Sequence, residues 1–513
     1  MKETDTVPVQ DTEAARAEEV ITKNGVLLSP LKKKLPFWRH FETLCATPRG
    51  SWNEGPIASV IEDLAKKNGL EVIKDKWNNV LVTVPASKGF EHIPSVCLQG
   101  HIDMVEVKDK GLKKEIFPIE LFFKTENVLK AIGTTLGADN GIAISYMLEI
   151  LTNRDIEHGP LELLFTATEE VGLVGAIGFD FSSIKSTKFI NLDSEEEGEF
   201  TVGCAGGSRI NGLFKPKFIN TPSGYCKFNI ELSDFVGGHS GAEIQKERGN
   251  AIKDLAIILT DLGKFNMNTL GEIKMHLVSF SGGEKDNAIP VSAKATVVLP
   301  EEDAENFLEI LQKQFEAVKM VWPKEPIKTE VARVGIILKE KMMDENSTKD
   351  FLEILIQLPH GVRSKQKEDK KLVQTSNNLA IVEMKGRKIA ISCMYRSSNQ
   401  TQLKGIGEII KGMFHYYGAK TKISSGYPGW IPQFDTPLLK TAVQQWEVMF
   451  DAKPVVTSTH GGLECGVISN KLKGVEIISF GPTMGDVHTT GEWVDVDSCE
   501  RVWKYLLLLL KSI

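Results

Sequence analysis

A histidine and an aspartate stand two residues apart in the segment Gly100-His101-Ile102-Asp103. They follow the apolar stretch Ser95–Gln99, which predicts a buried strand, and alternation along an extended chain puts both side chains on the same side. From there the aspartate can hold one imidazole nitrogen and orient the other toward a metal ion. Because a lone His-x-Asp pair is more often a structural contact, the motif gains weight only from its neighbours.

A glycine-rich stretch, Thr135–Gly141, carries Asp139 just before a predicted helix, Gly141–Leu151. Glycine tolerates backbone conformations that bring a carboxylate close to other groups. Asp139 is therefore either part of an ordinary turn or helix cap, or a carboxylate that bridges two cations.

Acidic residues also follow two further apolar strands. Glu169 and Glu170 come shortly after the predicted strand Leu161–Thr166, and Asp193 comes directly after Phe189–Leu192. Since neighbouring side chains diverge, one glutamate can bind a metal ion while the other stays free as a base. Most Glu-Glu pairs are simply solvated charge, but this pair stands at the carboxyl end of a strand.

His488 lies in a glycine-bearing loop after the apolar stretch Val475–Phe480, which gives a fourth strand-end position of the same kind. Histidine and carboxylate ligands without thiolates suit zinc, manganese or cobalt in a catalytic site that keeps an open position. Two such ions about 3.5 to 4 Å apart need a shared carboxylate, and Asp139 is the natural candidate. The seven scattered cysteines contain no Cys-x-x-Cys pair, which excludes a cysteine zinc cage.

The elements that must position these residues alternate between helix and strand, which predicts an α/β fold with a mainly parallel sheet. After Gly207 the pattern changes to that of an inserted α+β domain, and the α/β pattern resumes near the C-terminus. The first domain is therefore discontinuous. We expect a mobile N-terminal extension over 1–30, a catalytic domain over 31–207 and 425–513, and an inserted lid or dimerisation domain over 208–424.

Composition bounds the class of protein. The chain has 513 residues, 42% hydrophobic and 25% charged, which predicts a globular fold. A formal net charge of -7 and the lack of a long basic tract argue against a nucleic-acid partner. The polar N-terminus has no signal core, and the longest apolar run, Leu506–Leu510, is too short to span a bilayer. We expect a soluble cytoplasmic protein without a membrane partner.

The chain resembles the aminoacyl-histidine dipeptidase family of co-catalytic zinc peptidases, also called peptidase D or cytosol non-specific dipeptidase. The resemblance extends from about Pro36 to the C-terminus. Its motifs are Gln99–Val105, Gly133–Ile142, Thr168–Glu170, Asn191–Glu199, Gly203–Gly207, Gly237–Gly241, Tyr427–Trp430 and Gly462–Gly466.

The resemblance implies a role for each site residue. One divalent ion would be held by His101, Asp139 and Asp193, and the other by Asp139, Glu170 and His488. Asp103 would support His101, and Glu169 would be the general base. In the inserted domain, His239, Asn287 and Arg396 match substrate-contacting positions: His239 would stabilise the oxyanion, and Arg396 would pair with the substrate's terminal carboxylate. A structural surface role is the alternative for these three.

These features predict a metallopeptidase that hydrolyses dipeptides, including Xaa-His dipeptides such as carnosine, with two zinc ions, manganese and cobalt being alternatives. A related amidohydrolase acting on N-acyl amino acids and a catalytically silent metalloprotein scaffold are the competing hypotheses. The loop around His488 varies among relatives, so His460 is an alternative ligand. The resemblance also implies a homodimer through the lid.

Overall fold

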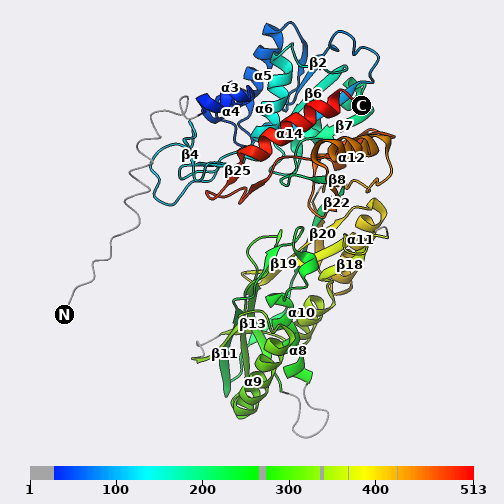
Figure 1. The fold of residues 1–513 in the computed structure, drawn as a ribbon. Coiled ribbons are helices and arrows are strands. Elements are labelled where there is room, and N and C mark those ends of the chain that lie inside the picture. The colour runs from blue at the N-terminus through cyan, green and yellow to red at the C-terminus, as the bar shows by residue number, and fades with distance from the viewer. Residues whose placement is uncertain (1–27, 265–272, 336–339, 368, 425) are drawn as a thin grey trace, which may run out of the picture. The chain divides into compact units, whose positions relative to one another are not determined.

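The computed structural model describes residues 28–513 apart from 265–272, 336–339, 368 and 425 (Figure 1). The chain forms two compact units. Unit 1 contains the described residues up to Cys204 together with Trp430–Ser458 and Leu463–Ile513, and unit 2 contains Ala205–Gly429 and Thr459–Gly462. The expected insertion, 208–424, falls within unit 2. Of the expected N-terminal extension, residues 1–27 lie outside the described residues.

Unit 1 is built on an eight-stranded sheet in the order β1-β2-β6-β3-β7-β23-β8-β22. The four central strands, β6, β3, β7 and β23, pair in parallel, whereas the pairs β1–β2, β2–β6 and β23–β8 are antiparallel. The predicted α/β class is confirmed, with the parallel part at the centre of the sheet. Every residue of β3 and β6 is buried, as expected for strands covered on both faces.

Helix α6 packs against the centre of this sheet and is buried along almost its whole length. Its sequence from Gly141 to Leu151 is nearly all apolar, which is typical of a helix enclosed on every side. Asp139 and Asn140 have non-helical backbone angles, so the regular helix begins at Gly141, where the sequence predicts it.

The helices of unit 1 are α3 (Ser29–Lys34), α4 (Trp38–Ala46), α5 (Gly55–Lys67), α6 (Ala138–Thr152), α7 (Val174–Gly178), α12 (Pro437–Phe450), α13 (Glu464–Lys471) and α14 (Val496–Leu510). Its strands are β1 (Glu71–Lys74), β2 (Val80–Val84), β3 (Val96–His101), β4 (Leu121–Phe123), β5 (Val128–Ala131), β6 (Leu161–Thr166), β7 (Lys188–Asn191), β8 (Glu199–Cys204), β22 (Val455–Thr459), β23 (Glu476–Ser479), β24 (Met484–Gly485) and β25 (Trp493–Asp495).

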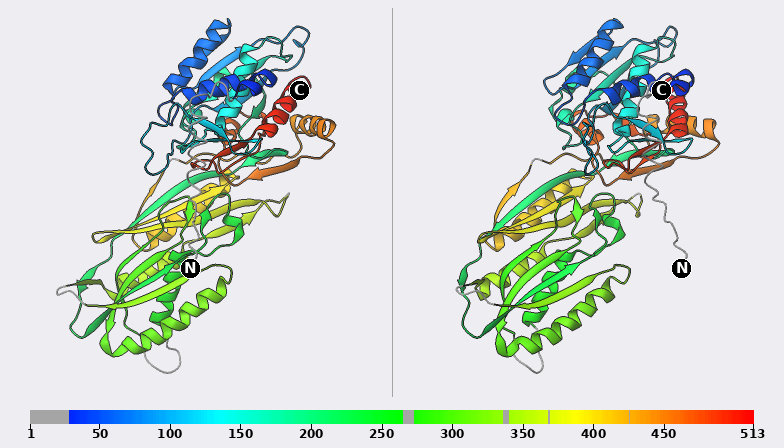
Figure 2. Two further views of the ribbon diagram at one scale, coloured as in Figure 1. Left: turned by 60° about the vertical axis from the view of Figure 1, so that its left-hand side comes forward. Right: turned by 90° about the vertical axis from the view of Figure 1, so that its left-hand side faces the viewer.

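Unit 2 is an antiparallel sheet with helices packed against it, in the strand order β16-β11-β15-β13-β19-β20-β9-β21, with β18 pairing β19 (Figure 2). The long hairpin of β19 and β20 turns at Gly386, whose φ of 61° suits a tight turn. In α9 the buried residues Phe307, Leu311, Phe315 and Val318 recur every three or four positions and form one apolar face.

The strands of unit 2 are β9 (Gly206–Phe214), β10 (Phe218–Asn220), β11 (Tyr225–Ser233), β12 (Gly238–His239), β13 (His276–Gly282), β14 (Ala288–Ile289), β15 (Ala293–Pro300), β16 (Lys328–Val334), β17 (Lys341–Met343), β18 (Gly361–Lys365), β19 (Val373–Lys385), β20 (Lys388–Ser397) and β21 (Lys420–Ile423). Its helices are α8 (Ala251–Lys264), α9 (Ala304–Val321), α10 (Glu345–Gln357) and α11 (Gln400–Tyr416).

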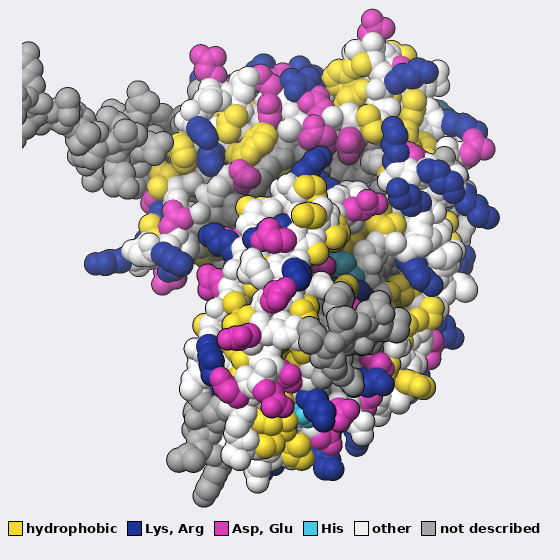
Figure 3. Space-filling model, turned by 90° about the horizontal axis from the view of Figure 1, so that it is seen from below, with side chains coloured by type: hydrophobic (Ala, Val, Ile, Leu, Met, Phe, Trp, Pro, Cys, Tyr) yellow, Lys and Arg dark blue, Asp and Glu magenta, His cyan; other side chains and the backbone are white. Residues whose placement is uncertain are grey.

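The surface seen in Figure 3 mixes basic and acidic side chains without segregating them. Such interspersed charge is the pattern of an ordinary solvated surface. All seven cysteines are buried free thiols. No helix among the described residues has the length and apolar content that crossing a bilayer requires.

Candidate metal centre

Several predicted site residues of unit 1 stand at or after the carboxyl ends of neighbouring parallel strands. His101 ends β3 and pairs in register with Thr166, the last residue of β6. The β6 strand leads to Glu169 and Glu170, and β7 leads to Asp193. Loops leaving this edge of a parallel sheet are where α/β proteins bind their ligands.

Asp139 stands between two histidines and turns one carboxylate oxygen toward each. Its Oδ1 lies 3.0 Å from Nε2 of His101, and its Oδ2 lies 3.1 Å from Nε2 of His488. Each histidine nitrogen also meets a second carboxylate: Asp193 Oδ1 lies 3.3 Å from His101, and Glu170 Oε2 lies 2.9 Å from His488. The structure therefore brings together the five predicted ligands as two triads that share one carboxylate.

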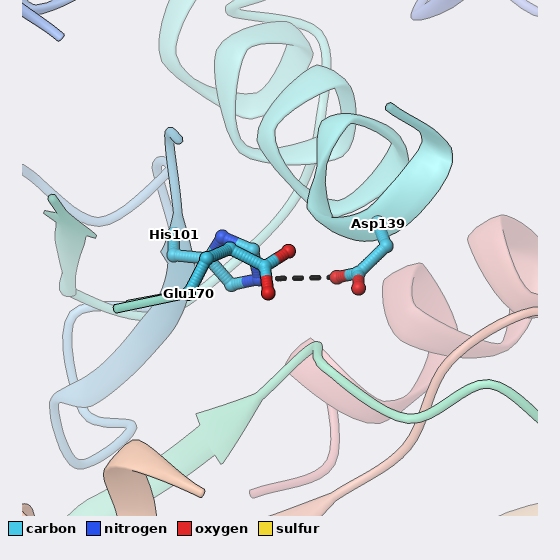
Figure 4. A group of neighbouring side chains, drawn as sticks. All are labelled: His101, Asp139 and Glu170. Atoms are coloured by element: carbon cyan, nitrogen blue, oxygen red, sulfur yellow. Dashed lines mark hydrogen bonds and ion pairs between the residues drawn. The ribbon is translucent and has the colours of Figure 1, made fainter. Parts of the chain in front are cut away.

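Figure 4 shows part of this group, with the side chains of His101, Asp139 and Glu170 directed toward one another. One potential ligand atom from each of these three residues lies within 4.8 Å of the other two. Nitrogen and oxygen donors converging at this spacing, without a thiolate, fit zinc, manganese or cobalt. The residues present therefore fit a pair of divalent ions.

The protonation pattern of the site points the same way. Hydrogen bonds with Asp139 and Glu170 raise the pKa of His488 to about 11. Burial alone would raise the pKa of Asp139, but hydrogen bonds from both histidines outweigh it and hold that pKa below its ordinary value. The carboxylates around the two imidazoles thus concentrate negative charge, which a bound cation would neutralise.

Asp103 contacts both His101 and the backbone of the Glu169–Glu170 pair. Nδ1 of His101 lies 3.1 Å from the main-chain oxygen of Asp103 and 3.5 Å from its Oδ1. The same carboxylate accepts hydrogen bonds from Ser51 Oγ at 2.8 Å and from the backbone N–H groups of Glu169 and Glu170 at 2.9 and 3.2 Å. Both the main-chain oxygen and the carboxylate of Asp103 thus face His101, and the carboxylate also holds the Glu169–Glu170 loop.

Glu169 differs from its neighbour in its partners. The Glu170 carboxylate faces His488, whereas no hydrogen bond or ion pair joins the Glu169 carboxylate to any residue that the structure describes. Burial raises the pKa of Glu169 well above its ordinary value, and the nearby carboxylates of Asp193 and Glu170 add to the rise. Among the described residues Glu169 thus has a carboxyl group without a hydrogen-bond or ion-pair partner and with a raised pKa, next to the predicted metal ligand Glu170.

A buried polar network lies beneath the ligands and was not predicted. Gln99 donates hydrogen bonds to Thr166 and to Glu464, and Asn191 donates to Gln99 at 2.7 Å. Burial raises the pKa of Glu464 to about 8. Because the network joins β3, β6 and β7 to α13, it fixes the strand ends from which the ligands project.

Two further buried residues, Arg49 and Glu492, contact the turn that carries Asp139. Sequence patterns missed both, because each stands alone in an irregular segment. The available signal was the position of Glu492, an acid between Gly491 and Trp493 only four residues after His488.

The predicted substrate-binding residues gather within unit 2. His239 in β12 pairs with Ala288 in β14, next to Asn287, whose main-chain oxygen accepts a hydrogen bond from Ser240 at 2.8 Å. A Cβ atom on Gly241 would lie 2.9 Å from the His239 ring and 3.3 Å from Cζ of Arg396, so both side chains lie close to that glycine. His239 and Asn287 are exposed, and Arg396 is buried.

Arg396 donates a hydrogen bond to the Tyr427 hydroxyl at 2.6 Å, while its Nε has no partner among the described residues. His460, the alternative ligand, also belongs to unit 2, and its Nε2 lies 2.8 Å from Ser376 Oγ. Burial, reinforced by Arg396, lowers the pKa of His460 to about 3. His488, and not His460, is the histidine that faces Asp139 and Glu170.

Comparisons with known proteins agree in one family. The sequence profile of Peptidase family M20/M25/M40 matches residues 97–512. The cytosol non-specific dipeptidase of Escherichia coli (strain K12) is 32% identical over 480 residues, which cover 93% of this chain and 97% of the relative. The structure of aminoacylhistidine dipeptidase from Vibrio alginolyticus is similar with a TM-score of 0.84 and 32% identity, covering 93% and 96% of the two chains. Aminopeptidase PepT from Bacillus cereus ATCC 10987 shares the fold at 17% identity, with a TM-score of 0.53 and coverage of 93% and 97%.

Proposed function

This chain belongs to the peptidase family M20/M25/M40, and we propose that it hydrolyses dipeptides with the help of two divalent metal ions. The proposal is carried by Asp139, whose two carboxylate oxygens each face the Nε2 atom of a different histidine. A carboxylate in that arrangement suits two adjacent ions. The two relatives at 32% identity are both named dipeptidases, which supports dipeptides as the substrates.

Each ion has its own set of ligands in this proposal. His101, Asp139 and Asp193 hold one, and Asp139, Glu170 and His488 hold the other. Bound there, the ions supply Lewis acidity, which polarises the peptide carbonyl and lowers the pKa of water toward about 7. Zinc is the proposed metal, with manganese and cobalt as alternatives, because the donors are nitrogen and oxygen only.

Glu169 acts as the general base and then as the general acid. Its carboxylate accepts a proton from the attacking water and later gives that proton to the leaving amine. Asp103 contributes by holding the backbone N–H of Glu169 at 2.9 Å, which fixes the base relative to the ligands. The raised pKa of Glu169 favours the acceptance of a proton, as its role requires.

Residues of unit 2 bind the substrate in this proposal. Arg396 pairs with the terminal carboxylate of the dipeptide, since its buried Nε is otherwise unpartnered among the described residues. His239 stabilises the oxyanion, and Asn287, next to the strand that pairs with His239, contacts the peptide. An arginine that binds the terminal carboxylate of the substrate leaves room for only one residue beyond the scissile bond.

We place the enzyme in the cytoplasm, as a homodimer formed through unit 2. Buried free thiols suit a reducing compartment, and the Escherichia coli relative is named a cytosol dipeptidase. Sedimentation of the purified protein measures the oligomeric state directly.

The test is release of free amino acids from a panel of Xaa-His and other dipeptides, tripeptides and N-acetyl amino acids. Each substrate is assayed with the metal-loaded enzyme, after chelation, and after zinc, manganese or cobalt is restored. We expect chelator-sensitive cleavage confined to dipeptides. Cleavage of acyl amino acids alone would instead identify an amidohydrolase, and metal binding without any cleavage would identify a silent scaffold.

A further inference from the structure

The carboxylate of Glu492 binds the turn that carries Asp139. Glu492 precedes β25 and is only 2% exposed. Its Oε2 accepts the backbone N–H groups of Leu136 and Gly137 at 2.7 and 2.9 Å, and its Oε1 accepts those of Ala138 and Asp139 at 2.8 and 3.4 Å. One side chain therefore satisfies four consecutive N–H groups.

These N–H groups belong to the turn that precedes the regular part of α6. Successive N–H groups in a turn form a concavity that attracts an anion. Glu492 fills this position with a charge of the protein itself. Because hydrogen bonds to an ionised acceptor are short and strong, the four bonds fix the backbone on which the Asp139 side chain is mounted.

Arg49 holds the same turn from its carbonyl side. Its Nη2 donates to the main-chain oxygen of Gly137 at 2.5 Å, and its Nη1 donates to the main-chain oxygens of Ile102 and Asp103 at 3.3 Å each. Arg49 is fully buried. It ties the Asp139 turn to the segment that follows His101, whereas Glu492 ties that turn to the segment that follows His488.

We propose that Glu492 is a positioning residue for the metal pair: by binding four N–H groups of the Asp139 turn, it sets the distance between Asp139 and His488. Only four positions separate His488 from Glu492, so the loop that supplies the second histidine is anchored on the turn that supplies the shared carboxylate. The inference rests on the metal centre of the proposed function and adds a residue to it that touches neither ion.

A positioning role predicts a different loss of metal affinity from the loss of a single ligand. Asp139 is shared by both ions, so a looser Asp139 turn should lower the affinity of the protein for both ions. His488→Ala removes a ligand of one ion and should lower the affinity for that ion alone. In Glu492→Gln the shape is kept, but an amide NH2 replaces one oxygen and faces two of the backbone N–H groups, which then lose their acceptor.

The experiment measures metal affinity without any substrate. Metal-free full-length protein is titrated with Mn²⁺ by calorimetry, and Co²⁺ binding is followed by its visible absorption spectrum. For Glu492→Gln we expect both Mn²⁺ dissociation constants to rise about 10- to 100-fold, the range found when supporting residues of a metal site are lost, with an altered Co²⁺ spectrum.

The matched control is Glu162→Gln. Glu162 is also a buried carboxylate, 5% exposed, that accepts backbone N–H groups, those of Lys185 and Ser186. That segment carries no proposed ligand, so both affinities should stay at the wild-type values.

Two dissociation constants and a Co²⁺ spectrum that match the wild type in folded Glu492→Gln would overturn the proposal. So would a loss confined to one ion, as in His488→Ala. If Glu492→Gln does not fold, Glu492→Asp keeps the charge but shortens the reach, and unchanged affinities in that variant would overturn it equally. A wild-type protein that binds two ions but cleaves no dipeptide would refute the proposed function and leave this inference standing.

Discussion

Replacing Glu169 by glutamine tests the assignment of the general base. Glutamine has nearly the same size and cannot accept a proton at neutral pH. Since no hydrogen bond or ion pair joins the Glu169 carboxylate to the described residues, the substitution removes no ligand contact and leaves the backbone N–H bond to Asp103 in place. We therefore expect Glu169→Gln to fold and to bind two ions with wild-type affinity.

The size of the rate loss follows from what the neighbouring carboxylates are doing. Glu170 faces His488, Asp193 accepts a hydrogen bond from Asn140 Nδ2 at 2.8 Å and faces His101, and Asp103 holds Ser51. None of them is free to replace the base. The full contribution of general acid–base catalysis, about 10²- to 10⁴-fold, should therefore be lost from kcat, which corresponds to about 3 to 5 kcal/mol in the activation barrier.

Single-turnover and steady-state cleavage of a dipeptide, measured beside metal content, checks this expectation. Glu170→Gln is the contrasting variant, because Glu170 is a proposed ligand and its loss should lower metal affinity before it lowers the rate of the loaded enzyme. A Glu169→Gln enzyme with two bound ions and an unchanged kcat would remove Glu169 as the base. A variant that lost its metal would show instead that Glu169 is a ligand.

Three further substitutions test other parts of the structure. Arg396→Lys should raise KM for dipeptides by roughly 10- to 100-fold with a smaller effect on kcat, because hydrogen bonds to charged groups contribute about 1.5 to 3 kcal/mol; an unchanged KM would contradict the carboxylate-binding role. Asp254→Asn should stabilise unit 2 above pH 6 by up to about 3 kcal/mol and have no effect below pH 4. Burial raises the pKa of Asp254 from 3.8 to about 6, so the folded wild type binds the proton more tightly than the unfolded chain and loses stability as the pH rises from about 4 to 6. Denaturant unfolding of both proteins at pH 4 and pH 7 measures the difference in the free energy of unfolding. Equal differences at the two pH values would refute this expectation. Gly137→Ala should weaken metal binding, because a Cβ there would clash with Nη2 of Arg49. Gly69→Ala is the control: Gly69 has a similar φ of 69° with open space around it, so the change should cost only about 1 kcal/mol of backbone strain and leave metal binding intact.

Much of the site was predictable because strand ends are regular. The predicted strands at Ser95–Gln99, Leu161–Thr166 and Phe189–Leu192 match β3, β6 and β7 to within two residues at each end. Parallel neighbours place the residues that follow them at one edge of the sheet. His101, Glu170 and Asp193 therefore come together from pattern alone. That Asp139 faces both histidines does not follow from pattern, because its turn has non-helical backbone angles.

Irregular loops account for what sequence patterns missed. Asp486 and His488 both have positive φ, 52° and 62°, a conformation that non-glycine residues rarely adopt. Periodicity therefore gives no direction for the His488 side chain or for Glu492 beyond it. Helix caps, by contrast, leave a signal in the sequence. Thr436-Pro437 is a clear start for α12, with Thr436 Oγ1 accepting the N–H of Leu439. Asp344 likewise caps α10 by accepting the N–H of Ser347.

The discontinuity of unit 1 fixes the order in which the centre is completed on the ribosome. Strand β23 pairs with β7 and β8, yet it is synthesised only after all of Ala205–Gly429. Until then the emerging chain keeps a gap in its sheet, with β7 lacking one partner, and contacts of such long sequence separation form slowly.

The same order governs the ligands. His101, Asp139, Glu170 and Asp193 are synthesised before Ala205–Gly429, and His488 is synthesised after it. A nascent or truncated chain that ends before His488 carries an acidic half-site that lacks the histidine facing Glu170 and also lacks Glu492. The proposed second ligand triad is thus completed only after the inserted unit 2 has been synthesised.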